Sequence, residues 1–247
     1  MNLKISIIIL TALLVSCEGK SQSRIVINIP TADTEAEYIW RTIQDIKFFE
    51  ENNYQISLPK GLFIQKLKGK AKLENLINED YEQLKEFVKD SVYNKADYQK
   101  GNEKIEKELV LINKINQSRY NWNFKEFKTY QVNLTLYGAG GSYNLDQGSI
   151  LIFTTTKGQF KNYDNPANTI IHEITHIGIE EAIITKNKVP HKLKERIVDT
   201  FVFLNFNQYL PHYRIQNMGE IGPDQYIKTK MDLKNLNSFV EIIMKEK

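Results

Sequence analysis

The segment TIIHEITHIGIEE constrains this chain more than any other, because an apolar helix carries three reactive side chains within it. Asn165 can cap such a helix and Pro166 suits its first position, so we expect a helix that runs to about Lys186. Apolar residues recur there at helical spacing and predict burial in the core: Ile170, Ile171, Ile174 and Ile177. The fold must therefore enclose this helix and still leave a use for its polar side chains.

Two histidines lie four residues apart in this segment, and residues at that spacing share one face of a helix. His172 and His176 can therefore bind one Zn²⁺ through two ring nitrogens. Glu173 lies about 100° around the helix, where it can reach a water on the metal but not the metal itself. Such a carboxylate takes a proton from the water and delivers it to a leaving amine. The alternative is a core helix whose histidines are hydrogen-bonded inside the protein.

A third protein ligand is needed, because two imidazoles do not hold zinc tightly. Glu180 shares a face with His176, but it lies about 12 Å along the helix from His172, too far to share one ion with it. Glu195 follows His176 after eighteen residues, on the next predicted helix, over residues 190 to 210. We therefore take Glu195 as the third ligand.

The pattern HEITH, followed after eighteen residues by Glu195 and then by Asp199, resembles that of the gluzincins, the thermolysin-like and aminopeptidase N-like metallopeptidases. The resemblance implies a zincin-like fold in which His172, His176 and Glu195 bind one Zn²⁺ per chain. It also implies that Glu173 is the general base and acid. Asp199 would hydrogen-bond the outer nitrogen of His172 and raise its basicity.

Two related patterns are missing from the chain. Metzincins place a glycine and a third histidine at positions that hold Ile179 and Ala182 here, so that class is excluded. The glycine–methionine–glutamate–asparagine motif of the aminopeptidases is also absent. Gluzincins use a tyrosine or histidine further along the chain to stabilise the oxyanion. Tyr209, His212 and Tyr213 are the candidates, at a much shorter spacing than in that family, and we take His212 for this function.

A run rich in β-branched and aromatic residues precedes the HEITH helix and predicts two strands, at residues 131 to 137 and 149 to 155, joined by a glycine-rich connection. In gluzincins an edge strand of the sheet binds substrate as an added strand. The resemblance assigns that function to Gly140, Gly141 and Tyr143, because glycine lets a peptide backbone approach closely. A plain hairpin turn is the alternative for this segment.

The chain begins with a short basic stretch and an apolar run of eleven residues, which is signal-peptide length. Residues 14 to 17, LVSC, resemble the lipobox of bacterial lipoproteins. The resemblance implies a signal peptide over residues 1 to 16, a lipid on Cys17 and a tether over residues 17 to 23. The protein would then be anchored in the bacterial cell envelope, facing the periplasm or the cell exterior. The alternative is an ordinary signal peptide with an incidental cysteine.

We expect one domain of the α+β class over residues 24 to 247, with a small mixed sheet packed on the HEITH helix and additional helices before it. Residues 24 to 130 are predicted to be largely helical, with a loop-rich stretch at 54 to 67 and a helix at 73 to 93. Residues 131 to 247 hold the predicted zinc site. The net charge of +3 is too small to indicate nucleic-acid binding.

These patterns together predict a zinc metallopeptidase that is anchored to a membrane by its N-terminal lipid and acts on a peptide or protein. One alternative is a catalytically inactive lipoprotein that uses the motif to bind zinc or peptides. Another is a structural lipoprotein whose helical region binds a partner and which carries no stoichiometric zinc.

Overall fold

The computed structural model describes residues 23 to 112, 120 to 215 and 219 to 246. The predicted signal peptide, Cys17 and nearly all of the tether lie outside these residues, so the lipid anchor stays a prediction. Within the described ranges, no helix combines the length and the apolar character needed to cross a bilayer.

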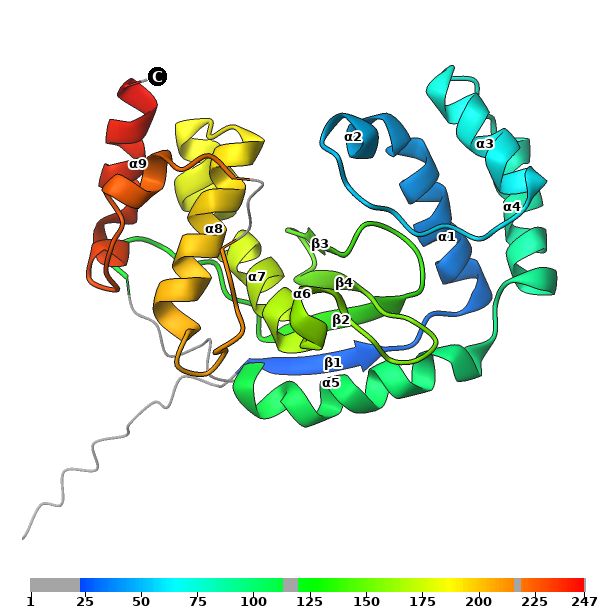
Figure 1. Ribbon diagram of the computed structural model, residues 1–247, viewed down its shortest axis with the longest axis horizontal. Coiled ribbons are helices and arrows are strands. Elements are labelled where there is room, and N and C mark those ends of the chain that lie inside the picture. Colours follow the sequence, from blue (N-terminus) through cyan, green and yellow to red (C-terminus); the bar gives the residue numbers. More distant parts are fainter. Residues whose placement is uncertain (1–22, 113–119, 216–218, 247) are drawn as a thin grey trace, which may run out of the picture.

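A small mixed sheet lies at the centre of the molecule, and helices pack around it (Figure 1). Its strands are β1 (Arg24–Asn28), β2 (Thr129–Thr135), β3 (Gly141–Asn144) and β4 (Ser149–Phe153), in the order β1-β2-β4-β3. The pairs β1–β2 and β2–β4 are parallel, whereas β3 runs antiparallel to β4 at the edge. The predicted α+β class with a small mixed sheet is therefore confirmed.

The two predicted strands differ from the observed ones in how they are connected. Both are present, but they pair in parallel, and the glycine-rich connection supplies the edge strand β3 between them. The tight turn lies later in the chain, because the side chain of Asn144 accepts the backbone N–H groups of Asp146 and Gln147. Gly148 closes this turn with φ at 58°. The segment from Gly141 to Asn144 is therefore a strand rather than the turn itself, and it forms a hairpin with β4 around this later turn.

The sheet has one apolar face and one polar face. Alternate side chains of β2 and β4 are buried on the apolar face: Tyr130, Val132, Leu134, Ile150 and Ile152. The other face carries amides that bond across the strands, since Asn28 donates to Asn133 at 2.9 Å and Asn133 donates to Ser149 at 3.0 Å. The apolar face is therefore the one that the helices cover.

Helix α7 (Pro166–Ile179) packs on the apolar face, next to α5 (Gln99–Ile112). Asn165 caps α7 as predicted, because its side chain accepts the N–H of Ala167 at 2.9 Å. Every residue of α7 is buried, which agrees with the isoleucine pattern. A π-helical segment (Glu180–Thr185) continues α7 before the chain turns into α8 (His191–Phe206).

Short elements complete this half of the molecule. They are the one-turn helix α6 (Lys161–Asp164), 3₁₀ turns at Gly222–Gln225 and Asp232–Asn235, and the terminal helix α9 (Leu236–Lys245).

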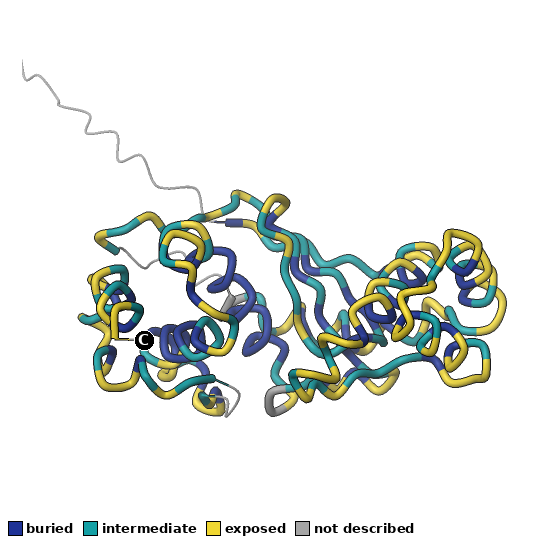
Figure 2. Tube along the Cα trace, turned by 90° about the horizontal axis from the view of Figure 1, so that it is seen from above, coloured by how far each residue is buried: buried dark blue, intermediate teal, exposed yellow. Residues whose placement is uncertain are grey.

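Four helices build a second apolar core of their own. They precede the half of the molecule that holds the candidate metal ligands, residues 129 to 246, which is the metal-site half. They are α1 (Ala32–Gln44), α2 (Ile46–Glu51), α3 (Leu62–Lys72) and α4 (Asn78–Ser91), and a 3₁₀ turn (Lys95–Tyr98) leads from them into α5. Figure 2 shows buried stretches of chain at both ends of the molecule, with the sheet between them.

The predicted boundaries within this helical part are wrong in one region. Residues 62 to 72 form α3 rather than a loop, and α4 begins at Asn78 rather than at residue 73. The carboxylate of Asp80 explains the start of α4, because it accepts the backbone N–H of Ile77 at 3.1 Å and an ammonium proton of Lys70 at 2.6 Å. Leu73 and Ile77 are consequently exposed in the connection instead of packed.

Direct contacts hold the helical part against the sheet. Glu35 of α1 is fully buried and accepts the backbone N–H of Leu136 at 3.0 Å. Ser57 and Gly138 exchange two backbone hydrogen bonds of 2.9 and 2.8 Å. These contacts place residues 53 to 57 beside the connection between β2 and β3.

Two glycine substitutions test this packing, because they differ in the space that a methyl group would find. At Gly178 of α7 a Cβ would lie 2.0 Å from the ring of Phe124, whereas at Gly69 of α3 nothing lies within 4 Å. We expect Gly178→Ala to lower the free energy of unfolding by about 1–3 kcal/mol. Gly69→Ala should raise it by about 0.5–1 kcal/mol. Urea denaturation of both variants measures this, and equal stabilities would contradict the packing of α7.

Candidate metal centre

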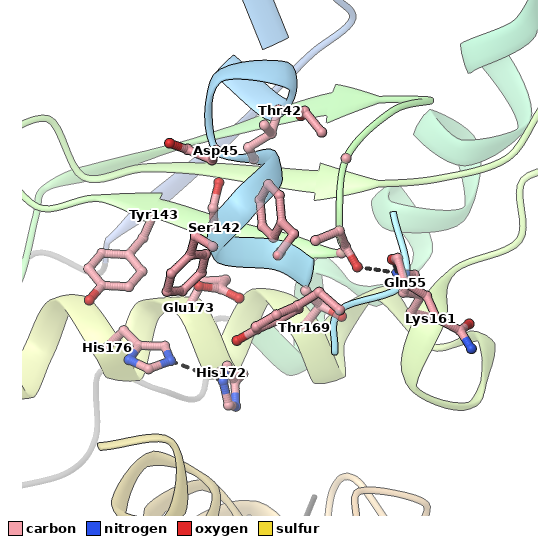
Figure 3. A pocket seen from close by; sticks show the side chains of 18 of the residues that line it. Thr42, Asp45, Gln55, Ser142, Tyr143, Lys161, Thr169, His172, Glu173 and His176 are labelled. Atoms are coloured by element: carbon pink, nitrogen blue, oxygen red, sulfur yellow. Dashed lines mark hydrogen bonds between the residues drawn. The ribbon is translucent and has the colours of Figure 1, made fainter. Parts of the chain in front are cut away.

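Three side chains from two helices meet at one largely buried point. His172 and His176 project from α7, and their Nε2 atoms lie 3.1 Å apart. Glu195 reaches them from α8, with its Oε2 at 3.4 Å from Nε2 of His172 and 3.5 Å from Nε2 of His176. Figure 3 shows the two imidazoles side by side along α7. The fold therefore brings together the ligand set that the sequence predicts.

The separations between these atoms fit a shared ion. A tetrahedral ion with bonds of about 2.0–2.2 Å holds its ligand atoms about 3.3–3.6 Å apart. The three observed separations of 3.1, 3.4 and 3.5 Å are close to that range. His172, His176 and Glu195 could therefore hold a metal ion with little movement.

The electrostatics of the site favour a bound positive charge. Burial lowers the pKa of His172, but hydrogen bonds to Asp199 and Glu195 outweigh it and raise that pKa to about 10. Burial raises the pKa of Glu195, but the charges of His176 and His172 outweigh it and hold the pKa well below its ordinary value. A metal ion would supply a positive charge that the carboxylates of Glu195 and Asp199 stabilise.

Asp199 and Tyr213 set the orientation of the first histidine. Oδ1 of Asp199 lies 3.2 Å from Nδ1 of His172, as the resemblance implies. Tyr213 adds a contact that the sequence did not predict. Its hydroxyl donates to Asp199 at 2.7 Å and lies 2.9 Å from Nδ1 of His172. Since the Tyr213 proton goes to Asp199, Nδ1 of His172 is the donor in this group. Its Nε2 then faces the ligand cluster, where a bound metal ion would replace the proton.

Tyr143 orients the second histidine. Its ring stacks on the His176 imidazole with centroids 4.9 Å apart and planes at 10°. Its hydroxyl donates to Glu180 at 2.7 Å and accepts from Lys194 at 3.2 Å, so two partners fix the hydroxyl end of the ring. Among the described residues, Nδ1 of His176 has no hydrogen-bond partner, so stacking takes over the orienting function. Tyr143, predicted to bind substrate, lies in the wall of the site against a candidate ligand.

Glu173 lies directly beside the edge strand. A Cβ at Gly141 would come within 2.2 Å of its Oε1, so only glycine leaves room for this carboxylate. Burial raises the pKa of Glu173, although the charges of both histidines act in the opposite direction. The carboxylate therefore stands between the ligand cluster and the backbone of β3.

A cleft of about 590 Å³ opens over these groups. The metal-site half lines it with β3, α7 and α8, and the helical part lines it from α1, α2 and the connection to α3. Figure 3 shows side chains from both halves converging in it. Gly140 and Gly141 are among the lining residues, as predicted for a substrate-binding edge.

His212, predicted to stabilise the oxyanion, is not brought to the site. It is exposed and does not belong to the residues that line the cleft. The reason is that the neighbouring Tyr213 turns inward to bind Asp199, which leaves His212 on the outer side of the loop.

Tyr54 and His191 occupy the cleft instead. The Tyr54 hydroxyl lies 3.1 Å from Nε2 of His191, whose Nδ1 lies 3.6 Å from Oε1 of Glu195. Burial, together with the charges of Glu195 and Glu173, raises the pKa of Tyr54 to about 12, so its proton is retained at neutral pH. His191 could have been found from its position four residues before Glu195 on one helix face. Tyr54 gives no comparable signal.

No family model, curated protein or solved structure matches this chain. What the site can do must therefore be argued from its residues and their geometry.

Asp199 provides a test of the site that does not depend on activity. We expect Asp199→Asn to weaken metal binding by about 10- to 100-fold, because the amide cannot replace the charge that holds His172. Titration of metal-free protein with Zn²⁺ against a competing chelator measures the affinity. Asp146→Asn, at an exposed turn, is the control and should bind as the unaltered protein does. Equal affinities in the two variants would remove the orienting function of Asp199.

Proposed function

We propose that this protein is a zinc-dependent peptidase of gluzincin type with a zincin-like arrangement of α7 under the mixed sheet. The observation that carries the proposal is the position of Glu173. Gly141 leaves room for its carboxylate between the candidate metal-ligand cluster and the edge strand β3. A buried helix with packed histidines does not require a carboxylate at that position. Bound zinc would supply Lewis-acid chemistry, activating a water and polarising a peptide carbonyl.

The chain's own residues supply the remaining steps. Glu173 takes the proton of the attacking water and returns it to the leaving amine, so that the peptide bond is replaced by a carboxylate and an amine. The unpaired side of β3 offers main-chain hydrogen bonds to an extended substrate. Asp199 and Tyr213 keep Nε2 of His172 directed at the ligand cluster.

Tyr54 is the group that we assign to the developing negative charge on the substrate oxygen. It lines the cleft, keeps its proton, and is steadied by His191. It belongs to the helical part, so this assignment makes that part necessary for catalysis.

The location in the cell follows from the N-terminal motif. We propose that Cys17 carries the lipid and that the peptidase faces the periplasm or the cell exterior, with peptides or proteins as substrates. Two acyl chains on this cysteine would anchor the protein stably, whereas a single chain would bind the membrane only weakly.

Glu173→Gln separates catalysis from metal binding. We expect this variant to bind zinc as the unaltered protein does and to lose at least about 10²-fold in cleavage rate, because an amide takes up no proton. A peptide library with mass-spectrometric detection measures cleavage, beside zinc quantification. Retained cleavage by the zinc-loaded variant would remove the base assignment. An unaltered protein that binds zinc and cleaves nothing would be the catalytically inactive binding protein.

Tyr54→Phe tests the assignment of the oxyanion donor. The substitution keeps the ring and removes the hydroxyl, so we expect kcat to fall by about 10²–10³-fold with little change in KM. Tyr226→Phe is the matched control, because the Tyr226 hydroxyl donates to Glu246, away from the cleft. Equal kcat values for the two variants would exclude Tyr54 from the reaction.

A further inference from the structure

Two basic side chains in the cleft form no ion pair with a carboxylate in the part of the chain that the structure describes. Arg41 and Lys161 line it, and among the described residues no carboxylate lies within 4.0 Å of either one. Lys194, the third basic residue there, is engaged with Glu180 at 3.7 Å and with the hydroxyl of Tyr143. Arg41 and Lys161 are therefore the cations of the cleft that an anionic ligand could bind.

Lys161 is held in place by backbone carbonyls. Its ammonium donates to the carbonyl of Gln55 at 3.0 Å and to that of Ala139, and it lies 5.4 Å from the centre of the Phe153 ring. An ammonium has three donors, so one remains for a ligand. Burial lowers the pKa of Lys161, because its charge is partly removed from water without a carboxylate to balance it. A bound anion would offset that cost.

Arg41 approaches the same edge strand from α1. Its guanidinium donates to Oγ of Ser142 at 2.7 Å, which leaves further donors in its planar fork. Alternate residues of a strand face opposite sides, so Ser142 faces away from the side on which Gly141 lies against Glu173. A Cβ at Gly140 would lie 3.5 Å from Cδ of Lys161. Arg41 and Lys161 thus meet the chain at Ser142 and Gly140, at and just before the start of β3.

Lys161 lies at the far end of the pocket from the candidate ligand cluster (Figure 3). Figure 3 shows Lys161 and Gln55 at one end of the pocket and Tyr143 with His176 at the other. Thr169 lies between Lys161 and Glu173, one helical turn or about 5.4 Å before Glu173 along α7. An extended peptide advances about 3.3 Å per residue, so a substrate that reaches both Glu173 and Lys161 extends more than one residue beyond the cleaved bond.

The net charge of the cleft points to the same class of ligand. Three basic residues line it, and so do three acidic ones, Asp45, Glu173 and Glu195. A bound divalent metal ion would leave the cleft net positive, which attracts anionic substrates.

We infer that Lys161 and Arg41 form a carboxylate-binding subsite, and that the peptidase selects substrates that carry a carboxylate at a position away from the cleaved bond. This inference rests on the proposed function. The carboxylate has two possible sources, an Asp or Glu side chain or a free C-terminus, and both would bind through charge-assisted hydrogen bonds.

Four versions of one cleaved peptide separate these sources. The peptide is taken from the library digestion and carries either Glu or Gln more than one residue from the cleaved bond, each with a free or an amidated C-terminus. We expect at least about tenfold higher kcat/KM for the version with the recognised carboxylate, chiefly through KM, which is the discrimination of one charge-assisted hydrogen bond. The pair of peptides that shows the difference identifies the source.

The variants then test the residues. Lys161→Met and Arg41→Gln should each reduce the preference, and Lys161→Arg should retain it because the charge remains. Lys66→Met, an exposed position on α3, is the control and should not alter the preference. Arg41 is exposed, so its variant remains informative even where Lys161→Met disturbs the contacts with Gln55 and Ala139. Equal cleavage of all four peptides, or an unchanged preference in both variants, overturns the inference.

Failure of the proposed function gives a different result. A zinc-loaded protein that cleaves nothing would refute peptidase activity, and calorimetric binding of the same four peptides would then test the subsite directly. Binding that prefers a carboxylate and is lost in Lys161→Met and Arg41→Gln would support the subsite in a binding protein. Equal binding of the four peptides would refute it.

Discussion

The meeting of one carboxylate with two imidazoles is the interaction on which the rest of this structure depends. Glu195 is largely removed from water, and a charge in such a place is stable only beside a compensating one. The imidazoles of His172 and His176 point at it from the neighbouring helix. Protonated imidazoles balance the charge of Glu195, and a metal ion at their centre would do so while engaging all three groups.

The cleft lies between two apolar cores, and each core positions a different set of the side chains that line it. The core under the sheet positions the ligand cluster and Glu173 on a fully buried helix, which gives them little freedom to move. The helical core contributes Tyr54 and Arg41 from the opposite wall. Glu35 and the paired backbones of Ser57 and Gly138 hold that wall against the sheet. A substrate would thus lie between two rigid parts and beside the edge strand β3.

Sequence patterns predicted the elements best where one periodicity ran without interruption. Helix α7 begins at its predicted cap and carries the isoleucines inward, because the apolar spacing and the Asn-Pro start agree. The patterns were misleading where a local polar contact decided the boundary. Asp80 starts α4 later than the apolar spacing suggests, and the Asn144 turn pairs β3 with β4. In both places the hydrogen bonds of one side chain outweigh an average propensity.

The sequence alone determined the candidate ligand cluster, since helical geometry relates His172 to His176 and a spacing of eighteen residues brings Glu195 onto the next helix. Only the tertiary structure decided which groups surround that cluster. Tyr54 and Tyr213 reach it from separate segments, Lys161 lines the far end of the same cleft, and His212 is left outside although it adjoins Tyr213. The physical reason is that a periodic pattern reports which face of one element is buried. It carries no information about which loop a distant element places against that face.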